Sequence, residues 1–194
     1  MKRSLVLAAS LLACALTHAQ PAPAAGDTWG SAPPASDDRF TNPKSKLYSG
    51  PNGWHNFGEV RAEVANAAKT RYGFKTGLNY LATSKSFVFA TNSQTQLVEV
   101  DFGTDQPAPG TYEVAAKPDP AQKKALVSLT DASGGKLLGW QSGDKAGTVT
   151  VSKVNGYLYF TARNLRLAPV GMSNKGDLKQ PMSLGFEGAV APEK

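Results

Sequence analysis

The chain has little cysteine and little histidine. Its 194 residues include one cysteine, Cys14, and two histidines, His18 and His55. Cys14 and His18 lie in the N-terminal stretch that is interpreted below as an export signal, so the rest has no disulfide, no thiolate nucleophile and no cysteine-based metal site. A site with several histidines is excluded, and a Ser-His-Asp triad would have to use His55. We expect His55, between Trp54 and Phe57, to be a loop residue.

Motifs of the common enzyme classes are also missing. The sequence contains no G-x-S-x-G elbow, P-loop, H-E-x-x-H or EF-hand pattern. The formal net charge is +6, but Lys123-Lys124 is the one adjacent basic pair after the N-terminus. Nucleic-acid binding requires a denser basic patch. We therefore predict a non-catalytic protein that uses no cofactor and no metal and does not bind nucleic acid.

Residues 1–19 have the features of a signal peptide. Lys2 and Arg3 precede an apolar run that is too short to span a bilayer, and cleavage is expected after Ala19. An alternative interpretation is that "LLAC" is a lipobox and that Cys14 is lipidated. The first alternative predicts a periplasmic or secreted protein, and the second an outer-membrane lipoprotein. Beyond this stretch no apolar run is long enough for a transmembrane helix.

The remainder divides into a leader and one domain. Residues 20–56 are rich in proline, alanine and glycine and are expected to form a flexible leader and loop, whereas residues 57–191 are expected to form a single β domain. The segment "EVRAEVANAAKTRYG" fits a helix or a strand, and we favour a strand because the downstream pattern is β. Further strands are expected near 78–82, 85–91, 96–102, 111–115, 124–130, 136–140, 147–154, 157–167 and 183–190. Strands in which apolar and polar residues alternate, separated by turn residues, predict an all-β fold. We expect an antiparallel β-sandwich or flattened barrel of about 8–10 strands with mostly meander or hairpin connections.

The stretch "TVTVSKVNGYLYFTARNLRL" at 148–167 predicts a β-hairpin with a defined register. Asn155-Gly156 favours a type I′ turn, which sets Val154 opposite Tyr157. Alternation then assigns one face of the hairpin to the core, with Val151 opposite Phe160, Val149 opposite Ala162, and Leu158 on the same face.

The opposite face of this hairpin is the first candidate site. It carries Tyr157, Tyr159, Arg163, Thr150 and Thr161. Tyrosine offers a rigid apolar plate with a polar tip, so this face is suited to bind a sugar. The alternative is a sheet surface that is solvated or packs against the leader or a second sheet.

Acidic residues supply two weaker candidates. Glu99, Asp101 and Asp105 could offer oxygen ligands to calcium, although further ligands are missing and an acidic strand face is the simpler interpretation. A glycan hydrolase could pair Glu99 or Asp101 with Glu187 or Glu113 at a separation suited to a glycosidase.

The long connection at 168–182 is the last candidate. It contains Met172, Lys175, Lys179 and Met182 and is expected to lack secondary structure of its own. Such loops are often functional, so this one could cover an end of the fold, the alternative being a plain linker.

Four segments carry a resemblance to a known group of proteins: "SFVFATNSQTQLVEVDF", "PAPGTYEV", "GTVTVSKVNGYLYFTARN" and "LGFEGAV". Over residues 58–190 the chain resembles small exported bacterial β-sandwich proteins, often lipoproteins, of unknown function, in which a Gly-Thr-Tyr strand start precedes a Gly-x-Val-x-Val-x-Lys hairpin. The resemblance implies fold and compartment and brings no catalytic residues.

Together these features predict an exported, non-catalytic binding or interaction module of the bacterial cell envelope. The expected partner is a glycan or an envelope protein. The alternatives are the envelope glycan hydrolase with paired carboxylates and a structural subunit of an envelope assembly.

Overall fold

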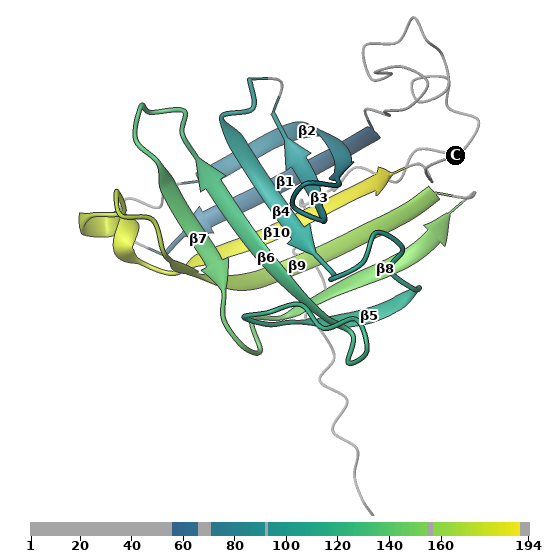
Figure 1. Cartoon of the computed structure of the whole chain (residues 1–194). Coiled ribbons are helices and arrows are strands. Elements are labelled where there is room, and N and C mark those ends of the chain that lie inside the picture. The colour runs from purple at the N-terminus through teal and green to yellow at the C-terminus, as the bar shows by residue number, and fades with distance from the viewer. Residues whose placement is uncertain (1–55, 66–70, 92, 155–156, 191–194) are drawn as a thin grey trace, which may run out of the picture.

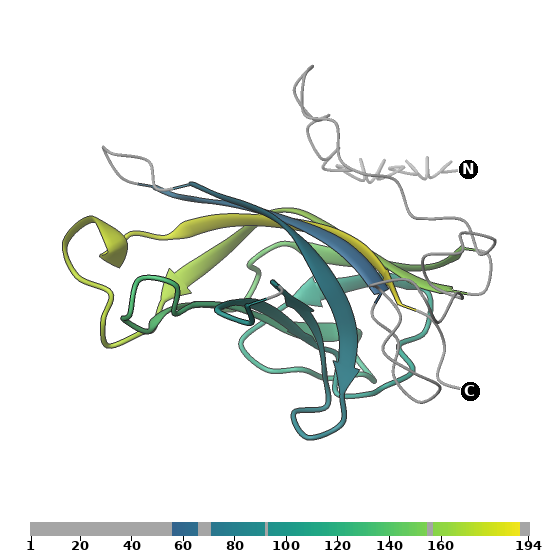
Figure 2. The ribbon, with the colours of Figure 1, turned by 90° about the horizontal axis from the view of Figure 1, so that it is seen from above.

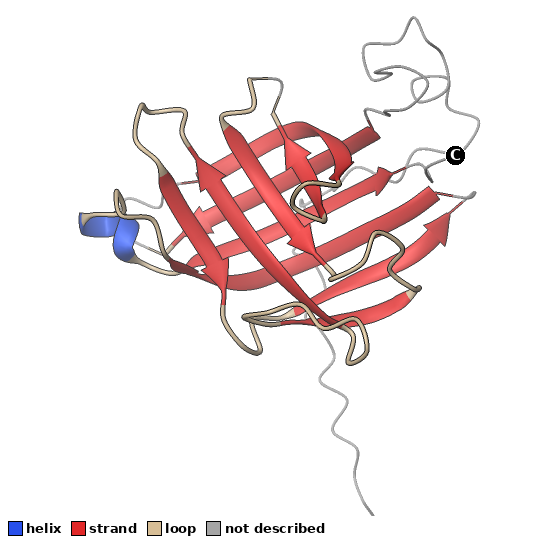
Figure 3. Ribbon diagram, in the orientation of Figure 1, coloured by secondary structure: helices blue, strands red, loops and turns tan. Residues whose placement is uncertain are grey.

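The computed structural model describes residues 56–65, 71–91, 93–154 and 157–190. The expected signal peptide, lipidation at Cys14, leader, His55 and Asn155-Gly156 turn lie outside these residues. The described part is an all-β fold (Figures 1 and 3). Its elements are β1 (Asn56–Val64), β2 (Arg71–Leu81), β3 (Ser86–Ala90), β4 (Gln96–Asp101), β5 (Gly110–Val114), β6 (Lys124–Asp131), β7 (Leu138–Ser142), β8 (Thr148–Val154), β9 (Tyr157–Pro169), the 3-10 helix η1 (Gly176–Lys179) and β10 (Met182–Val190). No helix within the described ranges is long and apolar enough to cross a membrane.

The strand pairings close into a ring. Strands β1 to β4 form an antiparallel meander, β4 pairs with β6, and β8, β9 and β10 form a second meander that returns to β1. Between β6 and β9 the ring is completed by β5 with β8 towards one end and by β7 towards the other. In Figure 1, β3, β4, β6 and β7 cross over β1, β10 and β9, and Figure 2 shows the curvature of these layers. The result is the expected all-β fold, a large and mostly antiparallel sheet whose last strand pairs with its first.

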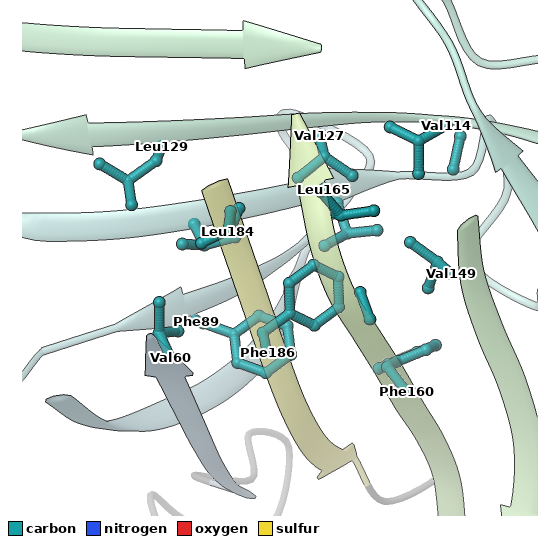
Figure 4. Close-up of a cluster of buried hydrophobic side chains, with 14 of the residues drawn as sticks. Val60, Phe89, Val114, Val127, Leu129, Val149, Phe160, Leu165, Leu184 and Phe186 are labelled. Atoms are coloured by element: carbon teal, nitrogen blue, oxygen red, sulfur yellow. The ribbon is translucent and has the colours of Figure 1, made fainter. Parts of the chain in front are cut away.

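The interior of the ring is filled by apolar side chains from both layers. Alternation along each strand turns every second residue inward, as the burial pattern of β6 shows. Phe160 is central, with its ring centroid 4.8 Å from Phe87 and 5.5 Å from Phe102, and Phe89 lies 4.9 Å from Phe186 (Figure 4). Each such aromatic pair adds about 0.5–1.5 kcal/mol beyond the burial of its area.

Two local predictions are confirmed. The part of the segment 59–73 that the structure describes is strand, since residues 59–64 belong to β1 and residues 71–73 to β2. In the hairpin of β8 and β9, Val154 pairs with Tyr157 and Val151 with Phe160, as the turn predicts. The expected core face, consisting of Val149, Val151, Leu158, Phe160 and Ala162, is buried.

Three expectations need correction. Strand β2 begins at Arg71 and not near residue 78, because the glycines at 73 and 77 lie within the strand and do not end it. The connection at 168–182 does have secondary structure, since β9 extends to Pro169 and η1 follows. The strand connections are less regular than the expected series of hairpins. Strand β5 pairs in parallel with one edge of β6, and β4 pairs antiparallel with the opposite edge.

Candidate functional site

The outer face of β9 and β10 carries a hydrogen-bonded cluster of three side chains. The Tyr159 hydroxyl donates to Oε1 of Glu187, and Nη2 of Arg163 forms an ion pair with Oε2 of the same carboxylate. Both carboxylate oxygens of Glu187 are therefore engaged by fixed donors. Nη1 of Arg163 also donates to the carbonyls of Phe186 and Ala162, each at 3.0 Å, which holds the guanidinium against the sheet.

A β-bulge lies beside Arg163. The pairing of β9 with β10 shifts register between Leu184 and Phe186, so that Arg163 and Asn164 together oppose Gly185. Asn164 has φ +54, a left-handed conformation that asparagine tolerates better than most residues. Bulges bend a strand and redirect its side chains. Here the bulge lies next to Arg163, beside the carbonyl of Phe186 that it contacts.

A second acid–base pair lies directly beside Glu187. Glu59 of β1 is the cross-strand partner of Glu187, and Arg61 donates from Nε to Oε1 of Glu59 at 3.0 Å. Cross-strand partners have Cβ atoms about 4.5–5.5 Å apart, so two carboxylates meet on one face. Each carboxylate has its own arginine, which offsets the repulsion between them. We call these five residues, Tyr159, Arg163, Glu187, Glu59 and Arg61, the outer-face cluster.

The cluster continues into a polar row across the sheet. Successive register pairs run from Glu59 to Glu187, Thr161, Thr150 and Thr111, on five neighbouring strands. Four strand spacings give a row of roughly 19 Å. Buried carboxylates form one end of this row, and the exposed hydroxyl groups of Thr150 and Thr111 form the other. The hydroxyl end offers an elongated ligand groups that both donate and accept.

The five hairpin residues expected at a binding site have different surroundings. Tyr159 and Arg163 belong to the outer-face cluster, and Thr161 and Thr150 belong to the polar row. Tyr157 is 6% exposed, so it does not present an open stacking surface. The candidate site is therefore centred on Tyr159 and not on a pair of exposed tyrosines.

The other expected acidic residues are not brought to the cluster. Glu99 and Asp101 lie on β4, which pairs with β3 and β6, whereas Glu187 lies on β10 between β1 and β9. Glu99 accepts a hydrogen bond from Ser86 at 3.2 Å, and Asp101 accepts one from the Gly103 amide at 2.6 Å. In the part of the chain that the structure describes, no group of three acidic, histidine or cysteine residues could hold a metal.

Sequence reasoning missed Glu59 and Arg61 as site residues. Their alternation with Val60 indicated an outward face, but which strand would lie beside β1 was not predictable. Comparison with protein-family models, curated proteins and solved structures finds no match. The assignment of a function therefore depends on the geometry of the described residues.

A hollow of about 500 Å³ lies at one end of the fold, between the β6–β7 loop and the segment after β9. Asp131 is among its lining residues and accepts hydrogen bonds from Ser133 Oγ at 2.6 Å and the Ser133 amide at 2.9 Å. Burial of the Tyr72 phenol, together with the charge of Asp131 and a hydrogen bond to it, raises the pKa of Tyr72 to about 12. The carboxylate of Asp131 is thus fixed by its neighbours at this end.

Proposed function

We propose that this protein is an exported, non-catalytic binding module of the bacterial cell envelope that recognises a glycan on its outer-face cluster. The observation that carries the proposal is the Tyr159–Glu187–Arg163 arrangement, in which both oxygens of a buried carboxylate have fixed donors. Such fixed polar groups lose little conformational entropy on binding, which favours affinity. Export is inferred from the N-terminal sequence, "MKRSLVLAASLLACALTHA".

The polar row supports an elongated ligand over a small compact one. Thr161 and Thr150 extend the site from the carboxylates towards Thr111, in register on adjacent strands. Sugar hydroxyls both donate and accept, which matches a surface of threonine hydroxyls followed by acidic and basic groups. The aromatic ring of Tyr159 adds a rigid apolar surface next to these polar groups.

The test is binding of soluble fragments from digested peptidoglycan, measured by native mass spectrometry and calorimetry. We expect Arg163→Met to weaken binding at least tenfold while the far-ultraviolet circular dichroism is unchanged. Ser128→Ala, on β6 in the other layer, is the matched control and should bind normally. If the wild-type protein binds no fragment, or if Arg163→Met binds as well as the wild type, the proposal is wrong.

The glycan hydrolase is a second candidate because Glu59 and Glu187 are cross-strand partners. Glycosidases need one protonated carboxylic acid and one carboxylate. Each of these carboxylates is already held in an ion pair by its own arginine, Glu59 by Arg61 and Glu187 by Arg163, and this arrangement favours binding over hydrolysis. Release of reducing ends from the same peptidoglycan, lost in Glu187→Gln, would support the hydrolase instead.

A further inference from the structure

Exposed apolar side chains gather at one end of the fold. Among the described residues, the large hydrophobic side chains that are exposed are Leu81 at 42%, Leu137 at 61%, Val170 at 60% and Met172 at 97%. Leu137 lies in the β6–β7 loop, and Val170 and Met172 follow β9, so three of the four belong to the loops around the hollow. Figures 1 and 2 both show the β6–β7 loop and η1 at the same end of the molecule. We call Leu137, Val170 and Met172 the apolar tip.

The two loops are joined to each other. The amide of Val170 donates to the Gly139 carbonyl at 2.9 Å, and the Gly139 amide donates to Oδ1 of Asn174 at 3.0 Å. Asn174 is buried and also donates to the carbonyl of Leu178 at 3.0 Å. This side chain therefore ties the segment after β9 to the start of β7, so that the apolar tip belongs to one ordered surface.

Basic residues surround the apolar tip. Lys136 and Lys175 line the hollow together with Met172, and Lys179 is in the last turn of η1. Of the acidic residues near the hollow and in η1, Asp131 is buried and hydrogen-bonded to Ser133, and Asp177 lies in the first turn of η1. Around the hollow and in η1, three exposed lysines thus accompany one exposed carboxylate, that of Asp177.

We propose that this end of the fold docks on an anionic phospholipid surface, with the apolar tip inserted among the headgroups and the lysines contacting lipid phosphates. Protruding side chains on loop tips are suited to insertion into an interface, where apolar burial and attraction to anionic lipid act together. The charge of the three lysines is complementary to that surface. This proposal uses no residue of the outer-face cluster and goes beyond the glycan-binding function.

The test is co-sedimentation of the purified protein with vesicles of phosphatidylglycerol and phosphatidylethanolamine, compared with phosphatidylcholine vesicles. A Cys14→Ala form, with its mass measured, is used throughout so that no acyl anchor contributes. We expect binding to the anionic vesicles that falls with added salt. Removing the charge of one lysine next to the membrane surface should weaken binding about fivefold. We expect the double variant Lys136→Ala/Lys175→Ala to lose about this factor for each of its two lysines.

Apolar and control variants complete the test. Met172→Ser should weaken binding about tenfold, in line with the loss of one buried side chain. Leu81→Ser and Lys117→Ala, which change an exposed leucine and an exposed lysine elsewhere, should bind normally. Equal binding to both kinds of vesicle, no binding to either, or normal binding of both tip variants would overturn the proposal. Arg163→Met should still bind vesicles, so failure of the glycan proposal can be told apart from failure of the membrane-docking proposal.

Discussion

Substitution of Glu187 by glutamine tests how strongly the outer-face cluster is coupled to the fold. The change keeps the shape of the side chain and removes the charge that pairs with Arg163. The Glu187 side chain is 10% exposed and that of Arg163 is 26% exposed, so the pair lies between a buried and a surface ion pair. Breaking a buried pair costs about 3–5 kcal/mol, and an exposed pair contributes about 0.2–1 kcal/mol.

We therefore expect Glu187→Gln to lower the free energy of unfolding by about 2 kcal/mol. This loss is smaller than the cost of breaking a fully buried ion pair, because Arg163 keeps two carbonyl acceptors and contact with water. In a domain of this size a loss of 2 kcal/mol lowers Tm by roughly 6–8 °C. Urea unfolding followed by circular dichroism, with Tm from calorimetry, measures both quantities.

A double-mutant cycle separates the pair from the single residues. Arg163→Met keeps much of the apolar stem, and together with Glu187→Gln it removes both charges. We expect the double variant to be less destabilised than the sum of the single variants by about 1–2 kcal/mol, because neither charge is left without its partner. A loss below about 0.5 kcal/mol for Glu187→Gln, or a coupling near zero, would refute the view that this pair is held away from solvent.

Three further predictions concern other sites. Because the pKa of Tyr72 is raised in the fold, its neutral phenol contributes stability fully below about pH 10, and this contribution is lost as pH rises towards 12. We expect Tyr72→Phe to lack this decrease in stability, which unfolding measured at several pH values will detect. Asn164→Val should destabilise the fold by about 1–3 kcal/mol because a β-branched residue is strained at φ +54, whereas Asn164→Gly should not, as thermal unfolding can compare. Thr76→Val should raise stability by about 1 kcal/mol in urea unfolding, since the buried Thr76 hydroxyl has no hydrogen-bond partner among the described residues.

The hairpin was predictable because its information is local. Asn155-Gly156 and strict alternation define the register from adjacent residues, and pairs such as Val151 with Phe160 follow directly. The bulge left a weaker local signal. Inward residues are spaced by two up to Ala162 and then by three to Leu165, so the alternation shifts where Asn164 adopts a positive φ. That shift could have identified the irregularity, but not the contact of Arg163 with β10.

The remainder of the site depends on pairing between distant segments. Glu59 meets Glu187 because the last strand returns to the first, and nothing near either residue encodes that closure. The same holds for β5, which pairs in parallel with the strand that follows it although β4 and β6 are antiparallel neighbours. Alternation assigns a residue to a face, and the partner strand is selected by the packing of the whole core.

Closure of the ring also limits how this protein can meet a partner. In the described part of the chain every strand has a neighbour on both sides, including β7 between β6 and β9. Part of a strand edge is still unpaired, because β2 pairs with β3 only from Gly77 onwards and residues 71–76 pair with β1 alone. Addition of a partner's strand is therefore limited to such short segments. The core aromatics already occupy the interior around Phe160. The larger surfaces for recognition are therefore the outside of the sheet and its ends, which is where the outer-face cluster and the apolar tip lie.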